Sequence, residues 1–300
     1  MSTPPMPAPA PKPAGQTPDQ ILKAPSVILM GEPGSGKTTA LLTLLRSGIE
    51  VFDVVLDPNG LDSILDAIDR DPDAAKLRDR FHYTEITPSP GGWDALKDMA
   101  NSVKVMGYED LAKMKQGIAK GKMDSLMHLL QSFENFIDDR TRQAYGDVTT
   151  WDDSRALVID SLSGINKIAK EHTAGLKPAM HQGEWGVAMN LEEQIIFKLV
   201  SDCQCYFVVL AHIDKVPNEI TGVPTISLAA LGNKLAPQLL KNFSEVVLTK
   251  REKDQFFWST SEMNAAVKNR ALPVKDKLPA TFEPIVKAHL QRKKNLGFTA

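Results

Sequence analysis

Residues 31–38 read Gly-Glu-Pro-Gly-Ser-Gly-Lys-Thr, and these residue types at this spacing suit the phosphate groups of a nucleotide. Glycine has no Cβ, so it lets successive backbone N–H groups curl around phosphate oxygens. A helix that begins directly after the loop adds the positive end of its dipole. The sequence therefore predicts a phosphate-binding loop of the Walker A type, Gly31-x-x-x-x-Gly36-Lys37-Thr38.

The side chains of this loop predict a bound ATP with Mg²⁺. Lys37 would reach the β- and γ-phosphates, and the Thr38 hydroxyl would ligate the Mg²⁺ ion. The nucleotide-binding residues are expected to be Gly31, Glu32, Pro33, Gly34, Ser35, Gly36, Lys37, Thr38 and Thr39.

A second candidate magnesium ligand is Asp160, at the end of the apolar run Ala-Leu-Val-Ile. A Walker B aspartate must sit at a strand end to reach the Mg²⁺ shell. Asp160 lies over a hundred residues beyond Lys37, with at least one complete strand between them. That distance favours the additional-strand arrangement of ATPases that move or remodel polymers, and it disfavours a small nucleotide kinase.

The elements that must position these residues predict an α/β fold. Apolar runs predict strands at 25–30, 51–57, 81–86, 155–160 and 205–212, alternating with helices. This alternation is typical of a mostly parallel sheet flanked by helices, and segments 244–252 and 255–261 add a C-terminal antiparallel hairpin.

The chain divides into three expected parts. Residues 1–20 are Pro/Ala-rich and predict a disordered tail. Residues 21–280 would form the ATPase core, with a helical insertion at about 93–145, and residues 281–300 would be a basic C-terminal tail.

Composition is ordinary for a globular protein. The net charge is −2, but residues 250–300 carry +6, so the C-terminal part is the natural place for a polyanion. Cys203 and Cys205 are too few for a zinc site, and a disulfide between two residues this close in sequence is implausible, so a reduced chain is expected. No apolar run is long enough to span a membrane. We therefore expect a cytoplasmic protein.

Five segments resemble the RecA superfamily of P-loop ATPases. Asp160-Ser161 is similar to its Walker B element, and His212 ends a strand where the family carries a polar γ-phosphate sensor. Lys268 and Arg270, in Val-Lys-Asn-Arg-Ala-Leu-Pro, resemble the K-x-R element that reaches into a neighbouring subunit's ATP. HQGEWGVAMN and LGNKLAPQLLKNFSEVV look most like phage-encoded, core-only RecA-like ATPases, some of which serve single-strand annealing and recombination.

The chain departs from this family at the residue that orients the attacking water. The family carries a glutamate just after the second strand, where this sequence reads Val-Val-Leu-Asp-Pro-Asn-Gly. Asp57 is our preferred substitute. Asn59 could instead occupy the glutamate's position, and Glu32 and Glu85 are further alternatives. If Asp57 only starts a turn, hydrolysis is expected to be slow.

The resemblance also implies a path for single-stranded DNA. In the family, the loops after the Walker B strand and after the sensor strand line that path, and the matching segments are 164–186 and 213–236. The candidate DNA-contacting residues are Lys167, Lys170, Lys177, Trp185, Lys215 and Lys234.

The expected function is therefore an ATPase of a RecA-like type that acts on single-stranded DNA, in phage recombination, annealing or replication. It would self-associate into a ring or filament with an active site shared between subunits. A phage single-strand-binding or recombination protein is a further expected partner, and the cytoplasm would be that of the host. Two alternatives stay open: a hexameric helicase- or packaging-type motor, and an ATP-gated scaffold without catalysis.

Overall fold

The computed structural model describes residues 22–88, 92–114, 117–118, 124–217, 222–232 and 234–298. The predicted disordered tail, residues 1–20, lies outside the described residues. The elements follow one another along the chain as β1 (Ser26–Gly31), α1 (Lys37–Ala40), α2 (Leu42–Arg46), β2 (Glu50–Val55), α3 (Asp62–Asp69), α4 (Ala74–Asp79), β3 (Phe81–Glu85), α5 (Trp93–Val105), α6 (Tyr108–Lys113), α7 (Ser125–Glu134), η1 (Val148–Thr150), β4 (Arg155–Asp160), α8 (Leu162–Ala174), α9 (Gln182–Asp202), β5 (Tyr206–Ala211), β6 (Ile213–Val216), β7 (Thr225–Leu228), α10 (Leu235–Leu240), β8 (Glu245–Glu252), β9 (Gln255–Ser259), β10 (Leu278–Pro279) and α11 (Glu283–Asn295).

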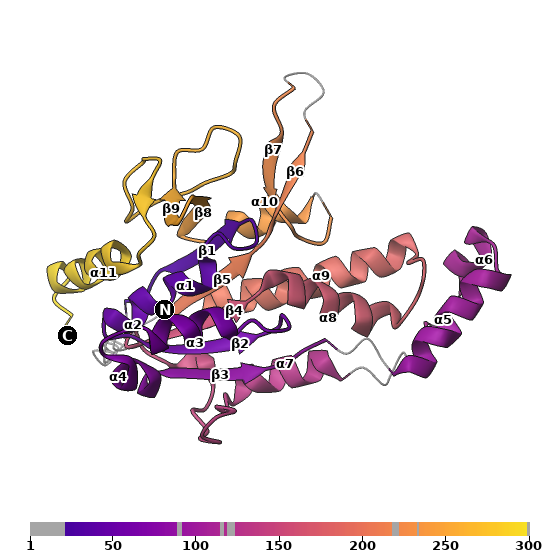
Figure 1. Cartoon of the computed structure of the whole chain (residues 1–300), viewed down its shortest axis with the longest axis horizontal. Coiled ribbons are helices and arrows are strands. Elements are labelled where there is room, and N and C mark those ends of the chain that lie inside the picture. The colour runs from indigo at the N-terminus through magenta and orange to yellow at the C-terminus, as the bar shows by residue number, and fades with distance from the viewer. Residues whose placement is uncertain are drawn as a thin grey trace, which may run out of the picture.

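The main sheet has eight strands in the order β10-β9-β8-β1-β5-β4-β2-β3 (Figure 1). The six strands from β8 to β3 are parallel, and β9 and β10 pair antiparallel at one edge. The predicted fold class is therefore confirmed. Strand β5 lies between β1 and β4, so the Walker A and Walker B strands are separated in space by one strand, as the additional-strand arrangement requires.

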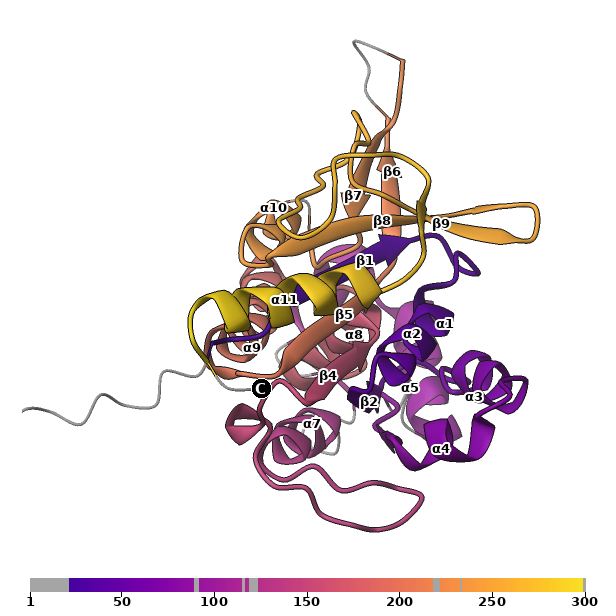
Figure 2. The ribbon, with the colours of Figure 1, turned by 90° about the vertical axis from the view of Figure 1, so that its left-hand side faces the viewer.

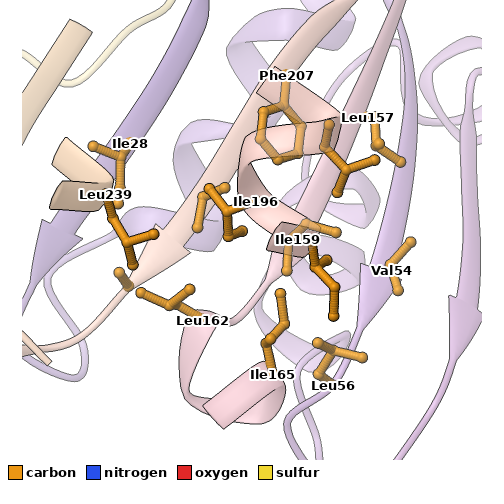
Figure 3. Packing of buried hydrophobic residues seen from close by; sticks show 14 of the residues in the cluster. Ile28, Val54, Leu56, Leu157, Ile159, Leu162, Ile165, Ile196, Phe207 and Leu239 are labelled. Atoms are coloured by element: carbon orange, nitrogen blue, oxygen red, sulfur yellow. The ribbon is translucent and has the colours of Figure 1, made fainter. Parts of the chain in front are cut away.

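The central strands bury both of their faces. Along β1, Ile28 and Met30 join one hydrophobic core, whereas Val27 and Leu29 join the other. Because side chains alternate across a strand, a continuous apolar run is what a strand covered on both sides needs. Helices α7 to α10 cover the first face, where Ile28, Ile159 and Phe207 pack against Ile165 and Leu239 (Figure 3), and α1 to α4 with α11 cover the second.

Helices begin earlier after the Walker B strand than expected. Residues 164–186 were predicted to be a loop, but α8 runs from Leu162 to Ala174 and α9 starts at Gln182. Leu162, Ile165 and Ile168 recur at helical spacing and are all buried, which explains the helix. The second predicted loop, 213–236, also contains ordered elements: the hairpin β6–β7 and the start of α10.

The insertion and the C-terminal segment flank this core. Among the described residues of 93–145 there are three helices, of which α5 and α6 lie apart from the sheet (Figure 1). Residues 281–300, expected as a basic tail, contain helix α11, which buries Ile285 and Val286 on the sheet. No helix among the described residues is long and apolar enough to cross a membrane.

Candidate active site

The phosphate loop joins the end of β1 to α1, and two of its glycines are required by their surroundings. Gly36 has φ +84°, and a Cβ there would lie 2.5 Å from the Phe256 ring. A Cβ on Gly31 would overlap the Thr249 side chain on β8. The β8–β9 hairpin therefore packs directly against the phosphate loop. Sequence reasoning missed this contact, because nothing local in residues 245–259 predicts which part of the fold they touch.

Lys37 lies inside the loop that it belongs to. Its ammonium group donates hydrogen bonds to the carbonyl oxygens of Gly31 (3.0 Å) and Glu32 (2.9 Å), and its side chain is buried. Burial lowers the pKa of Lys37, while the nearby carboxylates of Asp160 and Asp57 oppose that shift. This position holds a cation inside the glycine-rich loop, whose backbone N–H groups are suited to bind a phosphate.

Thr38, on α1, contacts Asp160, the last residue of β4. The Thr38 hydroxyl donates a hydrogen bond to Asp160 Oδ2 at 2.9 Å, although 122 residues separate the two in sequence. Burial raises the pKa of Asp160 to about 6, and the Thr38 hydrogen bond and Lys37 act in the opposite direction. Mg²⁺ prefers hydroxyl, carboxylate and phosphate oxygens. The two side chains therefore fit a magnesium ion that is shared with a bound triphosphate.

Asp57, Ser161 and His212 form a second group beside this pair. The Ser161 hydroxyl donates to Asp57 Oδ2 at 2.5 Å, and His212 Nε2 lies 4.0 Å from the same oxygen. Burial and the charge of Lys37 lower the pKa of His212, so its neutral form is favoured near pH 7. The structure thus brings the three residues to the strand ends beside Lys37. Ser161 was expected only as part of the Walker B turn, and its contact with Asp57 is new.

Two of the three alternatives to Asp57 have other surroundings. Glu32 pairs with Lys215 at 2.5 Å on the outer side of the loop. Glu85 lines a separate cavity of about 490 Å³, together with residues of α7. Asn59 lies in the turn after Asp57 with φ +62°. Glu32 and Glu85 therefore face other surroundings than the group formed by Asp57, Ser161 and His212.

The K-x-R residues, Lys268 and Arg270, lie at the end of the sheet where the parallel strands begin, opposite to the phosphate loop. Lys268 pairs with Val246, which is in register with Ile28 near the start of β1, whereas Thr249 is in register with Gly31. Three residues along a strand span roughly 10 Å, so neither Lys268 nor the exposed Arg270 beyond it reaches the phosphate loop of its own chain. The Lys268 ammonium donates to the carbonyl oxygens of Lys241 (2.9 Å) and Phe243 (2.6 Å).

The candidate DNA-contacting residues include two lysines that are held in ion pairs and two that are exposed. Lys177 is almost fully buried in an ion pair with Glu184 (2.8 Å), and Lys215 is paired with Glu32. Lys167 and Lys234 are exposed. The Lys170 ammonium lies 6.0 Å from the centre of the Trp185 ring, and that side chain is 39% exposed.

One buried acid near the site has no explanation in the sequence. Asp53 on β2 is completely buried, and neither of its carboxylate oxygens has a hydrogen-bond partner among the described residues. Burial and the neighbouring Asp160 raise its pKa well above the usual range. Within the described part of the chain, no group of three or more His, Cys, Asp or Glu side chains could hold a metal ion.

Comparisons with known proteins give only distant similarities. No protein-family model and no curated protein matches the sequence. Among solved structures, the RadB recombinase is similar at 13% identity, over 86% of each chain, with a TM-score of 0.38. The flagellar accessory protein FlaH of Methanocaldococcus jannaschii is similar at 10% identity, over 86% of this chain and 84% of its own, with a TM-score of 0.35. An ATPase of the type III secretion system of pathogenic bacteria is similar at 12% identity, over 76% of this chain and 53% of its own, with a TM-score of 0.34.

Proposed function

We propose that this chain is a RecA-like ATPase that assembles into a ring or filament and acts on single-stranded DNA, in phage recombination, annealing or replication. The observation that carries the proposal is the 2.9 Å contact between Thr38 and Asp160. It joins the Walker A loop to the Walker B strand across β5, with the Lys37 ammonium buried beside them. A plain glycine-rich turn would not need this contact, and the strand that lies between β1 and β4 disfavours a small nucleotide kinase.

The residues of the site have separate tasks in the proposed hydrolysis. Lys37 neutralises the β- and γ-phosphates, and Thr38 and Asp160 hold Mg²⁺, whose charge stabilises the phosphoryl group during transfer. Asp57 accepts a hydrogen bond from Ser161, which fixes its carboxylate for orienting a water. Neutral His212 senses the γ-phosphate. Catalysis would rest on positioning and charge neutralisation.

A second candidate function is an ATP-gated scaffold that binds the nucleotide and hydrolyses it very slowly. The 2.5 Å hydrogen bond between Ser161 and Asp57 favours it, because an engaged carboxylate is a weaker acceptor for a water proton. Turnover near zero with tight ATP binding would support the scaffold.

The experiment that tests the proposal measures ATP binding and turnover on size-fractionated protein, with and without single-stranded DNA. We expect Lys37→Ala to lose ATP binding and Asp160→Asn to lose Mg²⁺-dependent turnover, while both keep the wild-type circular dichroism spectrum. DNA should stimulate turnover. Strand displacement would favour a motor instead, and normal turnover by Lys37→Ala would refute an ATPase at this site.

A further inference from the structure

The hairpin formed by β8 and β9 holds the phosphate loop at two places. Thr249 on β8 lies against Gly31 and Ser35, and Phe256 on β9 lies against Gly36. Figure 2 shows the hairpin reaching past the end of β1, close to the loop that leads into α1. Neither Thr249 nor Phe256 belongs to the residues assigned above to magnesium, to the attacking water or to the γ-phosphate.

The hydroxyl of Thr249 ties the two sides of the loop together. It donates a hydrogen bond to the carbonyl oxygen of Met30 (3.3 Å), and its oxygen lies 2.6 Å from the hydroxyl oxygen of Ser35. A hydroxyl has one hydrogen to donate, so the Ser35 hydroxyl is the donor in the second bond. Both side chains are buried. The Ser35 hydroxyl therefore fixes the shape of the loop and is directed at Thr249.

Strand β8 approaches the start of the loop as closely as a glycine permits. A Cβ on Gly31 would lie 2.1 Å from the Thr249 hydroxyl oxygen and 2.7 Å from that of Ser35. Contacts this short do not occur, so any side chain at position 31 would separate Thr249 from Ser35. Gly31 is thus required by the hairpin as well as by a phosphate.

Phe256 supplies the packing that Gly36 lacks. Three atoms of its ring lie between 2.5 and 2.8 Å from the place that a Cβ on Gly36 would occupy. Gly36 has φ +84°, a conformation that glycine adopts freely but also leaves freely. The Arg251 guanidinium carbon lies 5.7 Å from the centre of the ring, and Arg251 is the direct cross-strand partner of Phe256. The ring is therefore held in place on the loop.

The base of the hairpin is anchored in the core. Directly opposite residues share a face of an antiparallel pair, so Thr249, Phe256 and Trp258 all lie on one face. Trp258 is completely buried, and its ring meets that of Phe282 edge to face at 5.1 Å. A hairpin fixed in this way can restrain the loop that its outer part touches.

We propose that Thr249 and Phe256 position the phosphate loop, so that the loop has its nucleotide-binding shape before ATP arrives. Glycines at positions 31, 34 and 36 give this loop unusual backbone freedom, and ordering it on binding would cost affinity. Contacts that order the loop in advance remove that cost. Both residues act through the loop and are positioning residues. The inference rests on the ATP binding proposed above.

The test is calorimetric titration of the full-length chain with ATP and with ADP. Phe256→Ala should weaken the affinity for both nucleotides about tenfold, because loop residues must then be ordered on binding. The matched control is Phe257→Ala. Phe257 follows Phe256 on β9, but its ring lies on the opposite face near Lys277, so the affinity should stay at the wild-type value.

Thr249→Val keeps the shape of the side chain and removes the hydroxyl, and it should weaken both affinities about fivefold. Thr249→Ser and Phe256→Tyr keep the hydroxyl and the ring, so they should restore the wild-type affinity. In Phe256→Ala without nucleotide, the amides of residues 31–38 should exchange hydrogen faster at an unchanged melting temperature. That local change separates positioning of the loop from a general loss of stability.

Wild-type affinity in both Phe256→Ala and Thr249→Val would overturn the inference, as would equal losses in Phe256→Ala and Phe257→Ala. The titration needs no hydrolysis. A wild-type chain that binds ATP without turning it over would therefore contradict the ATPase function while the affinity comparison still decides the role of the hairpin. A wild-type chain that binds neither nucleotide would overturn both.

Discussion

The carboxylate of Asp57 lies between a hydroxyl donor and an imidazole, at the strand ends that carry Lys37 and Asp160. Its Oδ2 atom accepts the Ser161 hydrogen bond at 2.5 Å and is 4.0 Å from His212 Nε2. A carboxylate held in this way can act on a water only if one of its lone pairs stays available. The hydroxyl of Ser161 therefore both orients Asp57 and limits it as a base.

Asp57→Asn should lower the rate of ATP turnover about a hundredfold or more, with ATP affinity nearly unchanged, because a positioned base typically contributes that much. Steady-state kinetics together with nucleotide titration separate the two effects. Glu85→Gln is the matched control, since Glu85 lines a different cavity and should keep wild-type turnover. If Glu85→Gln lost turnover and Asp57→Asn did not, the assignment of Asp57 would be wrong.

At the scale of elements, runs of apolar residues were enough to predict the strands. The runs at 25–30, 155–160 and 205–212 became β1, β4 and β5, since a strand covered on both faces must be apolar throughout. Asp160 could be proposed as a magnesium ligand because it ends such a run. The contact of Phe256 with Gly36 could not be predicted, because it depends on how the β8–β9 hairpin folds over the loop.

The two segments that were expected to be loops, 164–186 and 213–236, show why other parts of the fold could not be predicted from the sequence. Helix α8 has the apolar spacing of an amphipathic helix, but loops were assigned there from the family pattern. The hairpin β6–β7 is short, and its β6 strand is largely exposed, so it carries no apolar run that would indicate strands. Its ends are fixed by tertiary hydrogen bonds, such as Ala229 N–H to the His212 carbonyl (3.0 Å), which the sequence does not reveal.

The junction between α9 and the segment after β7 contains a buried acid. Glu192 Oε2 accepts a hydrogen bond from the Leu231 backbone N–H at 3.2 Å, whereas Oε1 has no partner among the described residues. Burial raises the pKa of Glu192 to about 8. Since the unfolded chain has the ordinary, lower pKa, it releases this proton first as the pH rises. Ionisation of Glu192 therefore opposes folding, and its cost grows between about pH 4.5 and pH 8.

Glu192→Gln should remove this cost while keeping an oxygen that accepts from Leu231. At pH 7 the variant should be more stable than the wild type by on the order of 3 kcal/mol, and at pH 4 the two should be nearly equal. Denaturant unfolding at pH 4, 5.5, 7 and 8.5 measures the difference. A stability difference that does not change with pH would show that Glu192 is ionised inside the fold.

The residues proposed to take part in hydrolysis lie at two opposite ends of one sheet. The phosphate loop, Asp160, Asp57 and His212 lie where the parallel strands end, and the β6–β7 hairpin rises from that edge (Figure 1). Lys268 and Arg270 lie at the other end of the sheet, where the strands begin. A single chain cannot bring these two sets together, because the sheet between them is rigid and packed on both faces.

ATP turnover should therefore depend on assembly. If Lys268 and Arg270 of one copy complete the site of another, turnover per chain should rise with protein concentration and be highest in the oligomeric fraction of a sizing column. ATP binding uses residues of one chain, so its affinity should be the same in monomer and oligomer. Measuring both quantities across a dilution series distinguishes the two dependences. A monomeric fraction that hydrolyses ATP as fast as the oligomer would show that each chain holds a complete active site.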